Sequence, residues 1–203
     1  MIKNIVFDLG NVLLSFKPLE YLRTKVTDER KIEQLHKEIF SSEEWLMLDR
    51  GIITEEEAIN RLCDRNPHNS ELIKLSMDNW YEILTPIEET VEILKEVKAK
   101  GYRTFVLSNF HLLAYEDVIK RCGFFKFFVG GIISYKENLL KPESEIYEKL
   151  ILKYDIDPTE TIFIDDTKVN VEGAQKLGIE TILFTNPEEL REKLIEYKVL
   201  DER

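Results

Sequence analysis

Short apolar runs alternate with amphipathic segments over most of the chain. The apolar runs predict buried strands at residues 2–7, 103–107, 131–134, 161–164 and 181–184. Between them, apolar residues recur at helical spacing and predict helices at residues 86–100, 111–121, 142–154, 169–177 and 187–197. Strands that alternate with helices form parallel sheets covered on both faces, so we expect an α/β fold with a helix-flanked parallel sheet.

One stretch interrupts this alternation. Its pattern is helical throughout, with helices predicted at residues 28–40, 54–62 and from residue 69 or 70 to 84. Several short helices in a row predict a small bundle. We therefore expect two domains, an α/β core made of residues 1–16 and 86–203, and an all-helical domain inserted at residues 17–85.

Polar side chains stand where the predicted strands end. They are Asp8 after the first strand, Ser108 and Asn109 after the second, Lys141 before the helix that follows the third, and Asp165 and Asp166 after the fourth. Ligands of parallel sheets bind beyond the carboxyl ends of the strands, so we expect these groups to share one crevice. Three carboxylates stay ionised together only beside a cation, and Mg²⁺ prefers such carboxylate oxygens together with water and phosphate.

Each of these residues also has an ordinary structural explanation. An Asp or Asn after a strand can form a turn or cap a helix, and Lys-Pro often joins a loop to a helix. Their joint occurrence at successive strand ends favours a site over four unrelated turns.

Composition narrows the possible partners and location. The chain has 203 residues, 43% of them apolar, and a net charge of −11 without a basic, aromatic-rich face, so nucleic acid is not an expected partner. Cys63 and Cys122 lack metal-ligand spacing and are expected to be free thiols. The first strand follows Met1 without a leader, and no apolar run reaches membrane-spanning length. We therefore expect a cytoplasmic protein with no membrane partner.

The chain resembles the haloacid dehalogenase superfamily of aspartyl-nucleophile hydrolases over nearly its full length. The four matching motifs lie at residues 7–12, 106–109, 141–147 and 163–170. The resemblance implies a Rossmann-like core, with residues 17–85 as the helical cap. Within the superfamily, Asp-Leu-Gly-Asn-Val at residues 8–12 and Leu-Asp-Arg-Gly at 48–51 look like the glucose-1-phosphate phosphatases and the amino-terminal phosphatase domain of epoxide hydrolase.

What the resemblance implies is a Mg²⁺-dependent phosphatase that forms an aspartyl-phosphate on Asp8. The implied metal ligands are Asp8, Gly10 through its carbonyl, Asp166 and, directly or indirectly, Asp165. The implied phosphate-binding groups are Ser108, the Asn109 backbone amide and Lys141, which is also expected to be catalytic.

One position departs from the family pattern. Most phosphatases of this superfamily carry a general-acid Asp two residues after the nucleophile, where this chain has Gly10. Loss of a general acid costs on the order of a hundredfold in rate. Two explanations stay open: a leaving group of low pKa, such as the anomeric oxygen of a hexose 1-phosphate, or a proton from Asp49 or His111. We also expect Arg50, Asp49 and His111 to determine substrate specificity.

Two other activities remain as alternatives. A 2-haloacid dehalogenase also lacks that acid, but it works without metal, so the adjacent Asp165 and Asp166 would leave uncompensated charge beside the nucleophile. A non-catalytic phosphate-binding regulatory protein would keep the pocket without turnover. We favour a phosphatase of a small phosphorylated metabolite, with a hexose 1-phosphate as the preferred substrate and a monomer as the preferred state.

Overall fold

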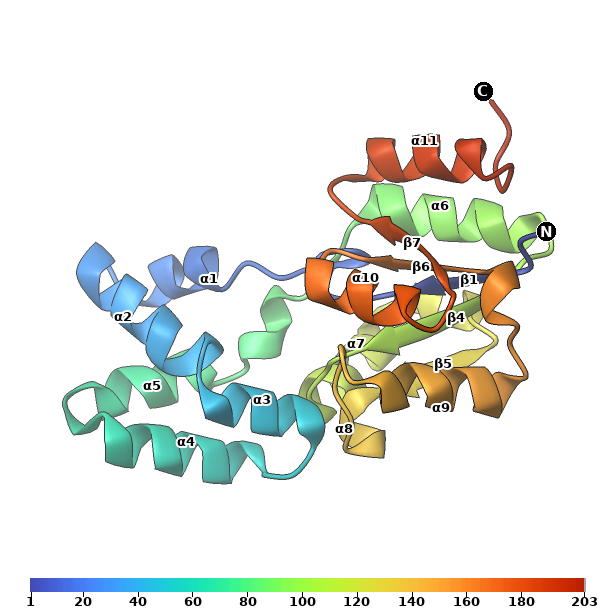
Figure 1. The fold of residues 1–203 in the computed structure, drawn as a ribbon. Coiled ribbons are helices and arrows are strands. Elements are labelled where there is room, and N and C mark those ends of the chain that lie inside the picture. The colour runs from blue at the N-terminus through green and yellow to red at the C-terminus, as the bar shows by residue number, and fades with distance from the viewer. Residues whose placement is uncertain (203) are drawn as a thin grey trace.

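The computed structural model describes residues 1–202 and contains a five-stranded parallel sheet (Figure 1). Its strands are β1 (Asn4–Phe7), β4 (Arg103–Ser108), β5 (Gly130–Ile133), β6 (Thr161–Asp165) and β7 (Glu180–Leu183). They lie in the order β5-β4-β1-β6-β7, and every pairing is parallel. Successive strands are added on one side of β1 as β4 and β5, and then on its other side as β6 and β7. A crevice is expected at the carboxyl end of the strand where this order switches.

Helices cover both faces of the sheet because successive strand residues point to opposite sides. The helices of the two layers are α6 (Glu88–Ala99) and α11 (Pro187–Glu196) on one face, and α9 (Ser144–Tyr154) and α10 (Lys168–Gln175) on the other. On β1, Ile5 and Phe7 pack in the apolar cluster of the first layer, whereas Val6 packs in that of the second. The predicted helix-flanked parallel sheet is therefore confirmed.

The segment between β2 (Leu14–Ser15) and β3 (Thr85–Pro86) contains helices and 3₁₀ turns. Its helices are α1 (Pro18–Lys25), α2 (Glu29–Phe40), α3 (Glu43–Arg50), α4 (Glu55–Arg65) and α5 (Ser70–Met77). Figure 1 shows them as a group beyond the carboxyl ends of the strands. β2 and β3 pair antiparallel, so the chain leaves and re-enters the sheet region at one place. We call residues between these strands the insert.

The remaining elements lie within the insert or between strands and helices of the core. They are α7 (Leu112–Arg121), α8 (Ser134–Glu137) and the 3₁₀ turns Pro67–Asn69, Trp80–Ile83, Gly123–Phe127 and Pro158–Glu160. α8 follows β5 directly and lies against α3 of the insert. This contact brings an insert helix next to the strand ends.

Several elements differ from their predicted bounds. The helix predicted to reach residue 84 ends at Met77, because Asp78 is extended and Asn79 adopts a left-handed conformation with φ 51°. The sequence pattern also did not indicate α1 or α3. The helix predicted to begin at residue 142 begins at Ser144.

Two features bear on the expectations from composition. Cys63 and Cys122 are both free thiols. Among residues 1–202, no helix combines the length and the apolar character needed to cross a bilayer.

Candidate active site

Three carboxylates and one lysine meet at the carboxyl edge of the sheet. Asp8 follows β1, Asp165 ends β6, and Asp166 comes next. One oxygen from each carboxylate lies within 4.8 Å of the others. Lys141 Nζ lies 2.9 Å from Asp8 Oδ1 and 2.6 Å from Asp165 Oδ2. The structure thus brings together residues that are far apart in the sequence.

Lys141 is buried and held in place by both its side chain and its backbone. Its Nζ donates to the carbonyl of Leu107 at 3.1 Å. Asn109 binds the lysine backbone twice, accepting from its amide at 2.9 Å and donating to its carbonyl at 3.1 Å. Burial lowers the pKa of Lys141, but Asp8 and Asp165 outweigh this effect and raise it. The lysine is therefore a fixed cation between two carboxylates.

Asp165 and Asp166 have different environments. Asp165 is fully buried, and its oxygens accept from Lys141 Nζ at 2.6 Å and from Asn170 Nδ2 at 3.1 and 3.2 Å. Asp166 is partly exposed and accepts from Asn11 Nδ2 at 3.2 Å. Asp166 therefore keeps more oxygen lone pairs for a cation, while Asp165 is placed to orient Lys141 and Asn170.

The charges of this cluster fit a divalent cation. The pKa of Asp8 is raised to about 7, mainly by burial and further by the charge of Asp165, while Lys141 opposes the rise. Burial also raises the pKa of Asp166. One lysine thus leaves the three carboxylates incompletely compensated, and a hard cation with oxygen ligands would remove this imbalance.

The nucleophile candidate is oriented by neighbouring donors. The backbone amide of Leu9 donates to Asp8 Oδ1 at 2.7 Å. A hydrogen bond from the buried Ser108 hydroxyl lowers the pKa of Asp8 and so favours its carboxylate form. Two residues later, Gly10 has no atom within 4 Å of the position that a Cβ would occupy. The space that the second Asp of the superfamily motif would occupy is therefore open in this protein.

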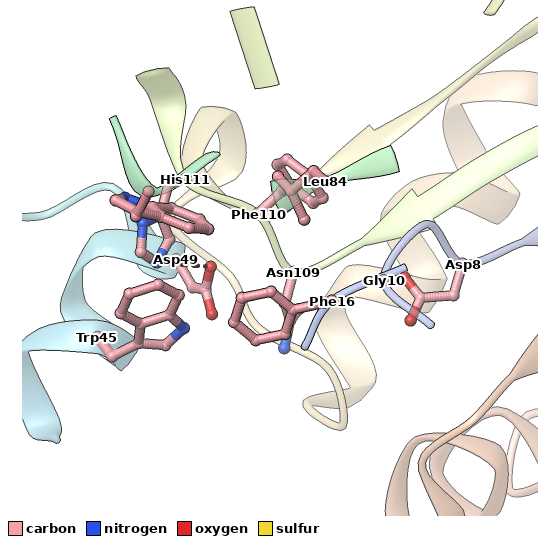
Figure 2. Close-up of a pocket in the computed structure, with 10 residues that line it drawn as sticks. Asp8, Gly10, Phe16, Trp45, Asp49, Leu84, Asn109, Phe110 and His111 are labelled. Atoms are coloured by element: carbon pink, nitrogen blue, oxygen red, sulfur yellow. Dashed lines mark ion pairs between the residues drawn. The ribbon is translucent and has the colours of Figure 1, made fainter. Parts of the chain in front are cut away.

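A pocket of about 130 Å³ extends from Asp8 toward the insert (Figure 2). Its lining consists of Asp8, Gly10, Phe16, Trp45, Asp49, Trp80, Leu84, Asn109, Phe110 and His111. The rings of Trp45 and Trp80 lie 4.7 Å apart between centroids, and Phe16 lies 5.9 Å from Trp45. These rings pack the insert and also form the wall of the pocket, so one end of the pocket is acidic and the other is aromatic.

Asp49 and His111 meet inside this pocket. Asp49 lies in the last turn of α3, His111 caps the start of α7, and His111 Nε2 is 3.2 Å from Asp49 Oδ1. The backbone of Trp45 is a further polar neighbour of the imidazole and raises its pKa, an effect that burial outweighs. The imidazole ring centroid lies 4.2 Å from that of Trp45 and 5.0 Å from that of Trp80. Both candidate proton donors from the sequence analysis therefore line the pocket.

Arg50, the last residue of α3, pairs with a residue of the core. Its guanidinium forms an ion pair with Glu143 and donates to the carbonyl of Asn138 at 3.2 Å. The Asn138 side chain donates in return to the carbonyl of Arg50 at 2.9 Å. Arg50 is not among the residues that line the pocket. Glu143 holds the side chain at the contact between the insert and the core, and a role of Arg50 in substrate specificity stays a prediction.

The aromatic wall is the part of the site that the sequence analysis missed. Phe16 and Phe110 contribute rings to it, and the aliphatic Leu84 lies beside them, from three separate segments. A lone apolar residue at the end of a segment has the same pattern whether it faces a core or a cavity. No sequence signal separates the two cases.

Comparisons with known proteins agree with this fold and with a phosphoryl site. A sesquiterpene phosphatase of Aspergillus oryzae is 25% identical over 184 residues, which cover 91% of this chain and 90% of that protein. A D-ribitol-5-phosphate phosphatase of Bacteroides thetaiotaomicron is 24% identical over 213 residues, an alignment that covers 96% of this chain and 97% of that protein.

A solved structure shows the same fold. It is a haloacid dehalogenase family enzyme from Bacteroides thetaiotaomicron in complex with magnesium and inorganic phosphate, with a TM-score of 0.72 and 25% identity, covering 91% of this chain and 95% of that one. A sequence model of the haloacid dehalogenase-like hydrolase family matches residues 2–178. This chain belongs to the haloacid dehalogenase-like hydrolase family.

Proposed function

We propose that the protein is a Mg²⁺-dependent phosphatase that hydrolyses a small phosphorylated metabolite through an aspartyl-phosphate on Asp8. The observation that carries the proposal is the cluster of Asp8, Asp166 and Lys141, of which Asp8 also lines the pocket. Two phosphatases among the relatives, matched over nearly the whole chain, support the same reaction type.

In this proposal each residue has one physical role. The Asp8 carboxylate forms a bond to phosphorus while the bond from phosphorus to the alcohol oxygen breaks. Lys141 and the Ser108 hydroxyl stabilise the negative charge on the non-bridging phosphate oxygens, together with the Asn109 backbone amide. Asp165 acts indirectly by holding Lys141. Asp8, Asp166 and the Gly10 carbonyl would hold Mg²⁺, which supplies further charge stabilisation when bound.

The aromatic wall limits the alcohol half of the substrate. Phe16, Trp45 and Trp80 offer flat apolar surfaces, which stack on rings or on the C–H face of a sugar. Besides Asp8 and Asn109 of the core, the polar lining residues are Asp49 and His111. The pocket therefore favours an alcohol with an apolar or flat face and few buried hydroxyls. A hexose 1-phosphate stays a prediction, to be compared with terpenyl, flavin and polyol phosphates.

The first test is phosphate release from 4-nitrophenyl phosphate. We expect turnover with Mg²⁺, loss of turnover with a chelator, and recovery when Mg²⁺ is restored in excess. Asp8→Asn removes the nucleophile and is expected to lower kcat by at least about a thousandfold, with an unchanged circular dichroism spectrum.

A matched control is Asp64→Asn, which changes an exposed carboxylate on α4 and should leave kcat unaltered. Full activity of the Asp8→Asn variant would contradict covalent catalysis. Chloride release from a 2-chlorocarboxylic acid would instead identify a dehalogenase, and phosphate binding without turnover would identify a regulatory protein.

A further inference from the structure

The active site lacks a carboxylate where the reaction needs a proton. An alkoxide that leaves phosphorus is a strong base and departs faster when it is protonated in the transition state. Gly10 has no side chain, and the space around it is open. The carboxylates in the pocket lining are Asp8, which is used as the nucleophile, and Asp49.

We propose that Asp49, delivered by the insert, is the general acid and general base of this enzyme. The inference rests on the proposed phosphatase function and names a catalytic residue within it. In the first step, the Asp49 carboxyl gives its proton to the alcohol oxygen as the bond to phosphorus breaks and Asp8 becomes phosphorylated. In the second step, the Asp49 carboxylate takes a proton from water while the water oxygen attacks phosphorus. The bond from phosphorus to Asp8 then breaks, and both residues return to their starting forms.

The position of Asp49 is fixed by contacts on both sides. Its backbone carbonyl accepts a hydrogen bond from the Ser134 hydroxyl, which belongs to α8 of the core. The next residue, Arg50, is paired with Glu143. Figure 2 shows the Asp49 carboxylate reaching into the pocket from the insert, with Asp8 at the opposite, core side. A substrate bound between them would place its alcohol oxygen between nucleophile and acid.

The surroundings of Asp49 keep it protonated near neutral pH. Burial, as the largest cause, and the negative charge of Asp8 together raise the pKa of its carboxyl to about 8, against the opposing effect of Lys141. His111, 3.2 Å away, is the other titratable group that faces it, and burial lowers the pKa of His111 to about 3. Burial therefore favours the neutral imidazole, which makes Asp49 the better proton donor of the two. The imidazole can accept a hydrogen bond from the protonated Asp49 and thereby position it.

The test uses two substrates that differ in the need for a proton. In 4-nitrophenyl phosphate the leaving group is a weak base, whereas in 4-nitrobenzyl phosphate it is a strongly basic alkoxide on a similar ring. We expect Asp49→Asn to lower kcat/KM for the nitrobenzyl ester by about 10²-fold or more and for the nitrophenyl ester by less than about threefold. This parameter reports the phosphorylation of Asp8, in which the acid acts.

The open space at Gly10 permits a direct rescue. Gly10→Asp introduces a carboxyl at the position where most phosphatases of this superfamily carry theirs. We expect the double variant to have a kcat/KM for the nitrobenzyl ester about tenfold or more above that of Asp49→Asn alone. A purely structural role of Asp49 would not be rescued by a carboxyl on a different segment.

The pH profile gives a further readout. The fall of kcat/KM on the alkaline side is expected in the native enzyme and should be absent in Asp49→Asn, because Asn does not titrate. Equal kcat/KM of the native enzyme and Asp49→Asn for both esters would overturn the inference while leaving the phosphatase proposal intact. Absence of Mg²⁺-dependent turnover in the native enzyme would overturn the phosphatase proposal itself.

Discussion

At the scale of single residues, the site places acids where they are costly to ionise. Asp49 has 14% of its side chain exposed and lies among aromatic rings, so its carboxylate is poorly solvated in the folded protein. An acid that binds its proton more tightly when folded makes stability fall as the pH rises. The loss begins near the unfolded pKa and is complete above the folded value of about 8.

This linkage predicts the effect of Asp49→Asn on stability. The neutral amide removes the cost of ionisation, so the variant should be more stable than the native protein by an amount that grows between pH 6 and pH 8. The growth should be about 1 to 3 kcal/mol, since one pKa unit corresponds to about 1.4 kcal/mol. Thermal unfolding at several pH values measures it, and a difference that does not change with pH would contradict the raised pKa of Asp49.

Residues at strand ends could be predicted to converge, because their positions follow from the sheet alone. Asp8, Asp165 and Asp166 belong to this group, whereas Lys141 reaches them from the loop between α8 and α9. The partner of Arg50 could not be predicted in the same way, because Glu143 lies 93 positions away and meets it through the packing of the insert on the core.

At the scale of elements, α3 is the helix on which the site depends. It ends at Gly51, whose φ of 72° is left-handed, and a Cβ there would lie 2.3 Å from the carbonyl oxygen of Tyr135. This close approach sets the distance between α3 and α8. It therefore also sets how far Asp49 reaches into the pocket.

The prediction at this scale compares two glycines. Gly51→Ala should destabilise the protein by about 2 to 4 kcal/mol and lower kcat/KM, because α3 must move away from α8. Gly101→Ala has a similarly left-handed φ of 91° but open space around it, so it should cost about 1 kcal/mol and leave kcat/KM unchanged. Unfolding in urea and steady-state kinetics of both variants provide the comparison; equal effects would show that the contact with Tyr135 is unimportant.

The sequence was less informative about helices of the insert than about those of the core. Core helices alternate with apolar strands, and this rhythm indicates them even when their own pattern is weak. α3 has only eight residues, and the helix before β3 is interrupted by the left-handed Asn79. Such short elements are stabilised by tertiary packing, which a local pattern does not contain.

At the scale of the whole molecule, the pocket lies between two parts of the fold. The core supplies the acidic end, and the insert supplies Trp45 and Trp80, the two tryptophans of the chain. Tryptophan emission should therefore report on this one place. We expect benzylphosphonate, which cannot be hydrolysed at its P–C bond, to change the emission saturably in the presence of Mg²⁺.

Methylphosphonate is the matched control for this titration, because it lacks the ring that would contact the indoles and should produce a smaller change. The two responses are compared by fluorescence titration at equal occupancy, established by inhibition of turnover. Inhibition by benzylphosphonate without a change in emission would place its ring outside the aromatic wall.

The chain passes between core and insert at the paired strands β2 and β3, so the whole intervening segment could be exchanged as one module. Exchanging this segment would change the general acid as well as the binding surface for the alcohol. If Asp49 supplies the proton, a donor module without an equivalent acid would bind its ligand and yet turn it over slowly. In this family member, selectivity and speed would be inherited together, and separating them would require restoring an acid at Gly10.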